Sequence, residues 1–234
     1  MTQADDAFTA LEQPARTARA AAAERSARQR DAERTKATIL AAAREEFCEN
    51  GFNGARVDSI AARAGANKRL LYHYFGNKEA LYAAVLVDAY AEIRRGERAL
   101  SLSRYEPTEA MDRLVRFTFR HFLANPWFPR LLAVENLQNA RFLRGIKDLP
   151  ALNSPVLAEL TDILKRGTEM GVFRTDVDPL QLYISIAGLG YFYVSNMKTL
   201  SVVFGRDLEQ FAMIQEREAI AVQMVLDYLR TRRR

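Results

Sequence analysis

The sequence predicts an all-α fold, and three observations carry that prediction. From Lys36 onward, apolar residues recur at spacings of three and four, which places them on one face of successive helices. No stretch alternates apolar and polar residues in the manner of a half-buried strand. Prolines and glycines recur between the apolar windows, where they divide the chain into separate helices. We therefore expect a small helical domain near the N-terminus and a larger one with about five or six longer helices beyond residue 90.

Length and composition are those of an ordinary globular protein. The 234 residues are enough for one large core or two modest ones, with 49% hydrophobic and 27% charged residues. No run approaches the roughly 18 to 20 apolar residues that span a bilayer, and residues 1–15 carry acids where a secretory signal would carry basic residues. One cysteine and two histidines exclude an internal disulfide and argue against a transition-metal site, so we expect no metal and no cofactor.

The segment of residues 16–36 is basic, with seven basic residues against three acidic ones and no apolar stripe. Such a segment cannot bury enough surface to fold alone. We expect residues 1–33 to form a flexible or marginally helical basic arm, and a merely solvated tail is the alternative.

The first two helices of the small domain follow this arm. Ile39, Ala43 and Phe47 repeat every four residues up to the turn ENGFNG, which ends the first helix. A second, much shorter helix lies within VDSIAARAG, where Ile60 and Ala61 face inward and a glycine stops it.

Two asparagines predict the starts of the next two helices. Asn67 can cap a third helix that runs to about Phe75. Asn77 can cap a fourth, which carries Leu81 and Val85 along one face.

The third helix has two different faces. At about 100° per residue, Lys68, Arg69, Tyr72 and His73 fall within one arc of about 140°, whereas Leu71 lies elsewhere with the core. A short helix, a tight turn and a second short helix with a cationic face are typical of a helix-turn-helix, whose second helix enters the DNA major groove. The alternative is that the rings pack inside a bundle, which would draw the cations toward a core where unpaired charge is costly.

The residue types on this face suit DNA. Lys68 and Arg69 can bond guanine or phosphate, and Tyr72 can lie against a thymine methyl group. Lys78, at the start of the fourth helix, and Arg56, at the start of the second, can each bind a phosphate.

Two motifs, ILAAAREEFCENGF and IAARAGANKRLLYHYFGNKEALYAAV, follow a known signature. In them, residues 37–87 resemble the tetracycline-repressor (TetR) family of bacterial one-component transcription regulators. The resemblance implies a helix-turn-helix DNA-binding domain at residues 34–82 and a helical effector-binding and dimerisation domain at residues 83–234. It places the DNA contacts on Arg56, Asn67, Lys68, Arg69, Tyr72, His73, Tyr74 and Lys78.

Two positions depart from the family's pattern. Ala55 and Arg56 stand where members usually have a Ser or Thr N-cap before the second helix. Arg69 stands where members often have a small residue, so the base preference of this chain is not inherited from a relative.

The resemblance also implies that the last two long helices form a four-helix bundle with a partner subunit. The segments DPLQLYISIAGLGYFYVSNMKTL and DLEQFAMIQEREAIAVQMVLDYLR suit this role, because Gly188 and Gly190 allow close helix approach and large rings are common at interfaces. Ordinary core packing within one chain is the alternative for these rings. The candidate dimer-interface residues are Tyr183, Tyr191, Phe192 and Met224.

The segment NPWFPRLLAVENLQNARFL indicates a candidate effector pocket. Two prolines break a helix there, and Glu135 and Asn139 follow four residues apart on one apolar helix, where polar groups need partners. The alternative is that these two side chains satisfy backbone or interdomain contacts and that His121 is a core histidine. The candidate ligand-binding residues are His121, Trp127, Phe128, Glu135 and Asn139.

Together these patterns predict a ligand-responsive, sequence-specific DNA-binding transcriptional regulator. By the resemblance it is a homodimeric repressor, released from a palindromic double-stranded DNA operator by a small organic effector. We expect it to be cytoplasmic and nucleoid-associated, with no membrane partner. An enzyme is disfavoured, because the chain has no glycine-rich phosphate loop, no paired Cys and His and no metal-ligand spacing. A helical interaction protein that does not bind DNA stays open, and it predicts that Lys68 and Arg69 are dispensable.

Overall fold

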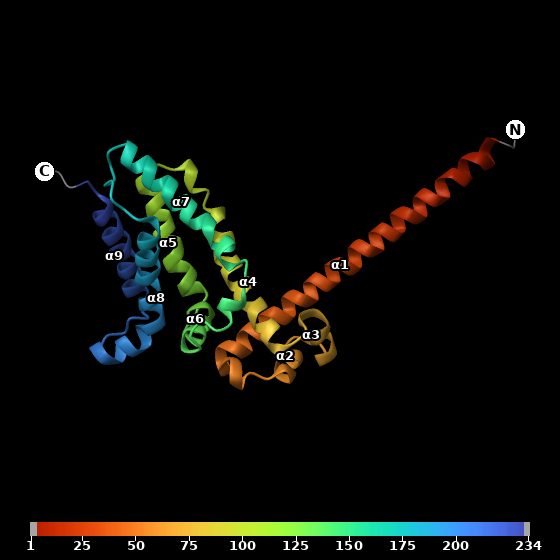
Figure 1. Cartoon of the computed structure of the whole chain (residues 1–234), viewed down its shortest axis with the longest axis horizontal. Coiled ribbons are helices and arrows are strands. Elements are labelled where there is room, and N and C mark those ends of the chain that lie inside the picture. The colour runs from red at the N-terminus through yellow and green to blue at the C-terminus, as the bar shows by residue number, and fades with distance from the viewer. Residues whose placement is uncertain (1–3, 232–234) are drawn as a thin grey trace.

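The computed structural model describes the backbone of residues 4–231 and the side chains of residues 26–231. Within that range every regular element is helical, as the sequence predicts (Figure 1). No helix of the described part is long and apolar enough to cross a membrane. The elements are α1 (Ala4–Gly54), α2 (Val57–Arg63), α3 (Lys68–Phe75), α4 (Lys78–Ala99), η1 (Leu102–Arg104), α5 (Pro107–Ala124), α6 (Trp127–Leu137), η2 (Leu143–Gly145), α7 (Leu149–Glu169), α8 (Pro179–Phe204) and α9 (Phe211–Leu229), where η marks a 3₁₀ helix.

Helices α1, α2 and α3 form the small N-terminal domain. The regular part of α1 ends at Gly51, whose φ of +64° opens the turn predicted at ENGFNG. Ile39, Phe47, Ile60 and Leu71 are buried in one core. The apolar side of α3 is therefore held inside the domain, and its opposite side is turned outward.

Both predicted asparagine caps are confirmed. Asn67 Oδ1 accepts a hydrogen bond from the backbone N–H of Leu70, and Asn77 Oδ1 accepts one from Ala80, each at 2.8 Å. Between α3 and α4, Gly76 has a φ of +79°, which a residue with a side chain rarely adopts. The two caps and this glycine set the short length of α3 and the sharp turn that follows it.

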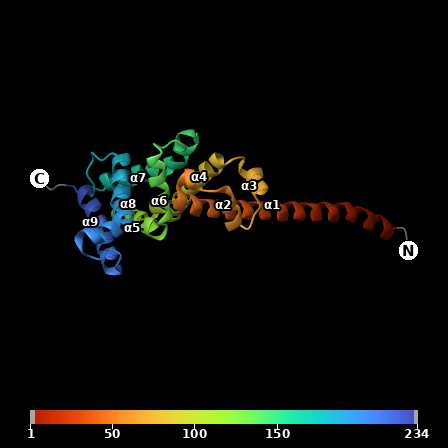
Figure 2. The same cartoon turned by 90° about the horizontal axis from the view of Figure 1, so that it is seen from below.

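The N-terminal part of α1 extends outward, away from both domains (Figures 1 and 2). Within the basic arm expected at residues 1–33, the backbone is helical from Ala4 onward, as part of α1. It is continuous with the first helix of the small domain instead of being a separate segment. Its flexibility stays a prediction, and residues 1–3 lie outside the described part.

Helix α4 belongs to both domains. The boundary expected between residues 82 and 83 falls inside it, since the helix runs without a break from Lys78 to Ala99. Near its start, the ring of Tyr82 packs against Phe52 at 5.3 Å and against Phe142 at 4.8 Å between centroids. One continuous helix therefore links the turn after α3 to the interior of the larger domain.

In the larger domain, α5 packs against α7, α8 and α9 (Figure 1). The core of the larger domain contains Leu114, Leu160, Leu182 and Val225, one from each of these four helices. Among the described residues five longer helices follow α4, in agreement with the expected five or six.

Position 167, on α7, requires glycine, because a Cβ there would lie 2.0 Å from Cδ2 of Phe173. The Phe173 ring is itself buried. We expect Gly167→Ala to lower the free energy of unfolding by about 1–3 kcal/mol through overpacking, and to lower the Tm by about 2–4 °C for each kcal/mol. Thermal unfolding measures this. Gly145→Ala is the control, since no heavy atom lies within 4 Å of its Cβ position, and equal Tm values for the two variants would contradict the prediction.

Candidate nucleic-acid interface

The outward face of α3 carries the predicted cationic and aromatic side chains. Lys68, Arg69, Tyr72 and His73 are exposed, and Tyr72 retains 43% of its accessible surface. Leu71, between them in sequence, is buried. The structure thus brings these four residues together on one solvent-facing side of a short helix, opposite the core.

Lys68 is held by a partner that the sequence does not reveal. Its Nζ lies 3.0 Å from Asp58 Oδ1, on α2. The hydrogen bond to this carboxylate raises the pKa of the Lys68 ammonium. The pair ties α3 to α2 at the exposed face, and Lys68 must leave Asp58 or share it to bond a phosphate or a base.

The start of α2 is capped from α1. Arg56 occupies the N-cap position and its own side chain makes no cap hydrogen bond, as expected from its residue type. Its backbone N–H instead donates to Glu46 Oε1 at 3.0 Å, and Glu46 is almost fully buried. Glu46 thus satisfies the N–H of the N-cap residue, and not the N2 or N3 N–H that a Ser or Thr side chain would bond. The Arg56 side chain is exposed to solvent.

Two residues at the edge of this face, Lys78 and Tyr74, are less exposed than the sequence suggests and contact other parts of the chain. Lys78 is half-buried, its Nζ donates to the backbone oxygen of Asn53 at 3.5 Å, and burial lowers its pKa. Tyr74 is half-buried beside α1, with its ring centroid 5.3 Å from Lys36 Nζ. Lys36, which the sequence does not mark as a contact residue, therefore lies next to α3.

The chemistry of this surface is that of an anion-binding face with aromatic rings. Its positively charged side chains are Lys36 on α1, Arg56 at the N-cap of α2, Lys68 and Arg69 on α3 and Lys78 at the start of α4, and its exposed rings are Tyr72 and His73 on α3. Among the described residues no group of His, Cys, Asp and Glu side chains is placed to hold a metal ion.

Three of the five predicted effector residues lie in packed surroundings around the junction of α5 and α6. His121 is buried, with its ring 5.6 Å from that of Phe128 and 5.8 Å from that of Phe117, and burial lowers its pKa to about 4. Trp127 lies under the guanidinium of Arg44 at 3.9 Å. His121 and Phe128 thus share one aromatic cluster, in which the imidazole is neutral.

The placement of Glu135 and Asn139 on one helix face is wrong. Helix α6 ends at Leu137, and Asn139 is exposed with a φ of +53°. Glu135 is buried and its Oε1 accepts hydrogen bonds from the backbone N–H of Phe142 at 2.8 Å and of Leu143 at 3.0 Å. Glu135 therefore satisfies the backbone of the chain after α6, which is the alternative that the sequence left open.

The four candidate interface residues divide into two pairs. The Tyr183 hydroxyl is bonded by Arg94, and the Tyr191 ring packs against Phe122 at 6.2 Å, so both contact their own chain. Phe192 and Met224 remain 58% and 52% exposed. The second pair is therefore the more exposed of the two, and Tyr183 and Tyr191 are half-buried.

Phe192 and Met224 belong to two apolar stripes on adjacent helices. Helices α8 and α9 lie side by side at the side of the larger domain away from the α1 extension (Figure 1). A groove of about 490 Å³ between them is lined by Gly188, Phe192, Met224 and Tyr228, among others. We name these residues the α8–α9 stripes: Leu180, Ile184 and Phe192 on α8, and Ile220, Met224 and Tyr228 on α9.

Two family models match the chain. The model of bacterial regulatory proteins of the tetR family matches residues 39–85, and the model of the tetracyclin repressor-like C-terminal domain matches residues 107–225. The first match covers the helix-turn-helix and the start of α4, and the second runs from the start of α5 into α9.

Curated relatives and solved structures agree with these matches. The transcriptional repressor NicS of Pseudomonas putida is 38% identical over 181 residues, which cover 77% of this chain and 85% of NicS. The transcriptional repressor SCO4008 of Streptomyces coelicolor is 37% identical over 155 residues, 64% of this chain and 72% of that protein. The fold is shared with a TetR-family transcription regulator from Marinobacter aquaeolei, with a TM-score of 0.66 at 23% identity over 88% of this chain and 100% of the other.

Proposed function

The chain belongs to the tetR family of bacterial regulatory proteins, and we propose that it is a homodimeric transcriptional repressor, released from a palindromic operator by a small-molecule effector. The observation that carries this proposal is the exposed cationic face of α3, whose opposite side is buried in a helix-turn-helix domain. The repressor names of NicS and SCO4008 support the sign of regulation.

In this proposal α3 of each subunit enters one major groove of the DNA. Lys68 and Arg69, in its first turn, bond base edges, and Tyr72 lies against a thymine methyl group. Asn67 holds the start of the helix through its cap. The phosphate contacts come from the surrounding residues Arg56, His73, Tyr74 and Lys78.

The α8–α9 stripes are the proposed dimer interface. Three large apolar side chains on each helix are about half-exposed, and such a patch is costly in water unless another surface covers it. Pairing the same patch on two copies produces a twofold axis, and twofold symmetry requires two inverted half-sites. The palindromic operator follows from this symmetry.

Release requires that the effector favour a conformation that does not fit DNA. Helix α4 is the connection, because it begins next to α3 and continues into the core of the larger domain. A hundredfold loss of operator affinity requires the effector to prefer the released state by about 2.7 kcal/mol.

Genome-wide capture of DNA fragments by the purified protein tests this proposal. At physiological salt we expect one or a few sites to be enriched, each with two inverted half-sites. Binding to all fragments alike, with affinity that falls steeply with salt, would mean that the protein binds phosphates without sequence preference, and the proposal would be wrong. The enriched sites also supply the operator fragment for the experiments that follow.

A further inference from the structure

The chain before the small domain is charged in two blocks of opposite sign. Residues 16–36 contain seven basic residues and three acidic ones, and we name them the basic segment. Residues 1–15, which precede this segment, contain three acidic residues and no basic one. The core of the small domain begins at Ile39. A local excess of four positive charges therefore lies directly before the DNA-binding domain.

The basic segment lies at the end of the molecule that carries α3. Its backbone is helical and continuous with the part of α1 that packs in the small domain. In both views the N-terminal part of α1 leaves the molecule at the end where α3 lies, and α9 lies at the opposite end (Figures 1 and 2). The last residue of the segment, Lys36, has its Nζ 5.3 Å from the centroid of the Tyr74 ring on α3. A duplex bound by α3 therefore lies close to the basic segment.

No described side chain of the basic segment is buried. From Ser26 to Lys36 the side chains are exposed, apart from Ala32 and Thr35, which are partly exposed. A helix without a buried face gains no stability from packing, so it is marginal in water. Two arginines four residues apart, at positions 30 and 34, add repulsion between like charges on one face. A polyanion beside the segment relieves this repulsion and so favours the helix.

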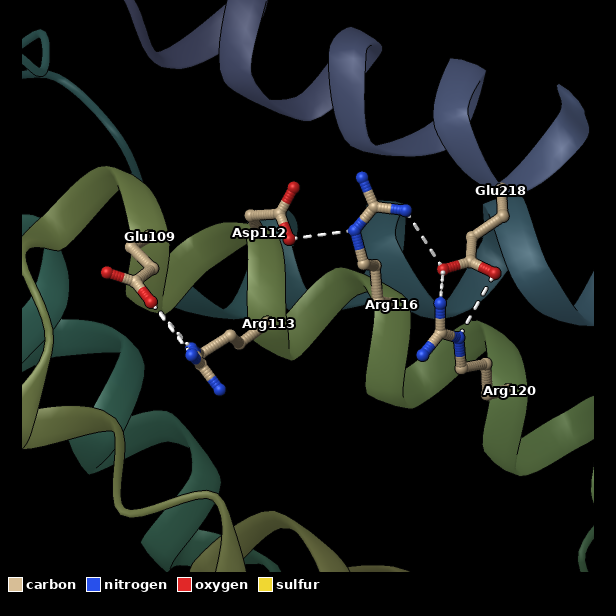
Figure 3. Close-up of polar contacts among 6 residues, drawn as sticks. All are labelled: Glu109, Asp112, Arg113, Arg116, Arg120 and Glu218. Atoms are coloured by element: carbon tan, nitrogen blue, oxygen red, sulfur yellow. Dashed lines mark hydrogen bonds and ion pairs between the residues drawn. The ribbon is translucent and has the colours of Figure 1, made fainter. Parts of the chain in front are cut away.

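Arginines of the larger domain differ from those of the basic segment in their counter-charges. Figure 3 shows three arginines of α5, each beside a carboxylate. The pairs are Arg113 with Glu109, Arg116 with Asp112 and Arg120 with Glu218, each at 2.8 Å. Arg30 Nε donates to the backbone oxygen of Ser26 at 3.3 Å, and no carboxylate of the described residues forms an ion pair with Arg30 or Arg34. An arginine of α5 must leave a carboxylate to bind a phosphate, whereas Arg30 and Arg34 have none to leave.

We propose that the basic segment of each subunit binds the phosphate backbone of the DNA that flanks the operator, outside the half-site contacted by α3. This inference rests on the proposed function, because it extends the surface by which the repressor holds its operator. A helix of 21 residues, the length of the segment, is about 32 Å long, which matches about nine base pairs at 3.4 Å each. Phosphate contacts carry no sequence information, so the segment adds affinity whatever the flanking sequence.

The acidic block sets the outer limit of this contact. Asp5, Asp6 and Glu12 have charges of the same sign as the phosphates, and residues 1–15 offer no cation to balance them. Release of counterions from DNA requires Lys or Arg. The contact is therefore assigned to residues 16–36 and not to the whole of the chain that precedes the small domain.

Operator fragments with and without flanking DNA test this inference by fluorescence anisotropy. One duplex ends at the outer edges of the two half-sites, and the other has about ten further base pairs of arbitrary sequence on each side, the length that the segment spans. We expect the flanks to raise the affinity of the full-length protein about 10- to 100-fold at physiological salt, since each phosphate contact contributes a factor of about 5 at about 0.15 M salt relative to 1 M. Equal affinities for the two fragments would mean that the segment is a solvated tail, and the inference would be wrong.

The variant Arg30→Gln with Arg34→Gln assigns the effect of the flanks to the basic segment. Both positions are exposed, and glutamine has a good helix propensity, so the fold is retained. Four arginines are lost per dimer, and we expect the flanks to raise affinity about 10-fold less than in the native protein. The slope of log K against log salt should become shallower by about 2 to 4.

The matched control is Arg104→Gln with Lys165→Gln, which removes the same charge from exposed positions of the larger domain and should keep the full effect of the flanks. If Arg30→Gln with Arg34→Gln responds to the flanks as the native protein does, the basic segment is not the contact and the inference is overturned.

Deletion of residues 2–15 tests the outer limit. We expect the flanks to raise the affinity of this variant at least as much as that of the native protein, because the deletion removes three acidic residues and no basic one. A smaller effect of the flanks would place the contact in the acidic block and contradict its assignment to residues 16–36.

The two proposals fail in distinguishable ways. If the protein binds the short operator fragment and the flanks add nothing, the inference about the basic segment fails and the proposed function stands. If no preferred site is found, the proposed function fails. A salt-dependent affinity for arbitrary DNA that Arg30→Gln with Arg34→Gln lowers would then still support the phosphate contacts of the segment.

Discussion

The double substitution of Lys68 and Arg69 by alanine is expected to weaken binding to the operator fragment by about 1,000-fold. A dimer carries each substitution twice, so four contacts to bases or phosphates are lost. At about 1 kcal/mol for each contact, the lower end of the range for good base contacts, the loss is about 4 kcal/mol. Fluorescence anisotropy with the operator fragment and with a scrambled fragment of equal length measures the affinity and its sequence specificity.

The control for this experiment must remove the same charge elsewhere. Arg104→Ala with Lys165→Ala also removes two positive charges, from exposed positions on η1 and α7 in the larger domain, and should leave operator affinity nearly unchanged. Asp58→Asn should raise the operator affinity, in contrast to the Lys68 substitution, because it frees the Lys68 ammonium from its ion pair with the Asp58 carboxylate. If the double variant binds the operator as the native chain does, α3 is not the recognition helix and a helical interaction protein becomes the better description.

The small domain could be predicted because its signals are local. Asn67 and Asn77 cap the starts of α3 and α4 by accepting a hydrogen bond from the N–H three residues on. Gly65 and Gly76, both with positive φ, follow the ends of α2 and α3, so sequence neighbours determine these boundaries. The exposed arc of α3 follows from helical periodicity alone. Contacts between residues that are distant in sequence were not predicted. Glu46, on α1, accepts a hydrogen bond from the N-cap N–H of α2, and Asp58, on α2, forms an ion pair with Lys68, the first residue of α3.

The larger domain was predicted less well, for two physical reasons. The sequence was interpreted as one helix that reaches Asn139, whereas α6 ends at Leu137 and Asn139 has a positive φ. Asn often occupies the left-handed position just after a helix, so the residue type at position 139 could have indicated this end. Helix α8 is apolar on nearly all sides, so periodicity cannot choose between Tyr183, which faces Arg94, and Phe192, which faces solvent.

An ion pair buried on α4, with Arg94 Nη1 2.9 Å from Glu97 Oε2, illustrates a third reason. In the segment IRRGER the charged residues have the pattern of a solvated surface, and two of the four are among the most buried residues of the chain. Burial of Arg94 and Glu97 depends on the packing of α5 and α7 against α4 and on the contact of Arg94 with Tyr183 of α8, which local sequence does not encode. Sequence therefore predicted that an effector domain exists and could not indicate which of its polar groups are desolvated.

Phe192→Asp is expected to separate the subunits and, with them, to abolish tight operator binding. Because Phe192 is 58% exposed in its own chain, each copy loses the burial of just over half of one large ring, about 1.5 kcal/mol. It also places a carboxylate in an apolar contact, which costs about 1.5 kcal/mol or more. Two copies per dimer lose at least about 6 kcal/mol, which raises the dimer Kd by more than about 10,000-fold. If the native dimer has a Kd of about 1 nM, the variant dimer has a Kd of about 10 µM, so the variant is mostly monomeric at a protein concentration of about 1 µM.

Sedimentation velocity measures the subunit state, and anisotropy with the same operator fragment measures binding. Leu137→Asp is the matched control, since Leu137 is 82% exposed at the end of α6, away from the α8–α9 stripes. Because a monomer holds one half-site only, it loses the effective concentration that the second subunit provides, while its α3 is unaltered. The variant should therefore still distinguish the half-site from a scrambled fragment, weakly. A Phe192→Asp protein that stays dimeric at about 1 µM would place the interface on another surface, whereas a monomer with full operator affinity would show that twofold pairing is not needed for recognition.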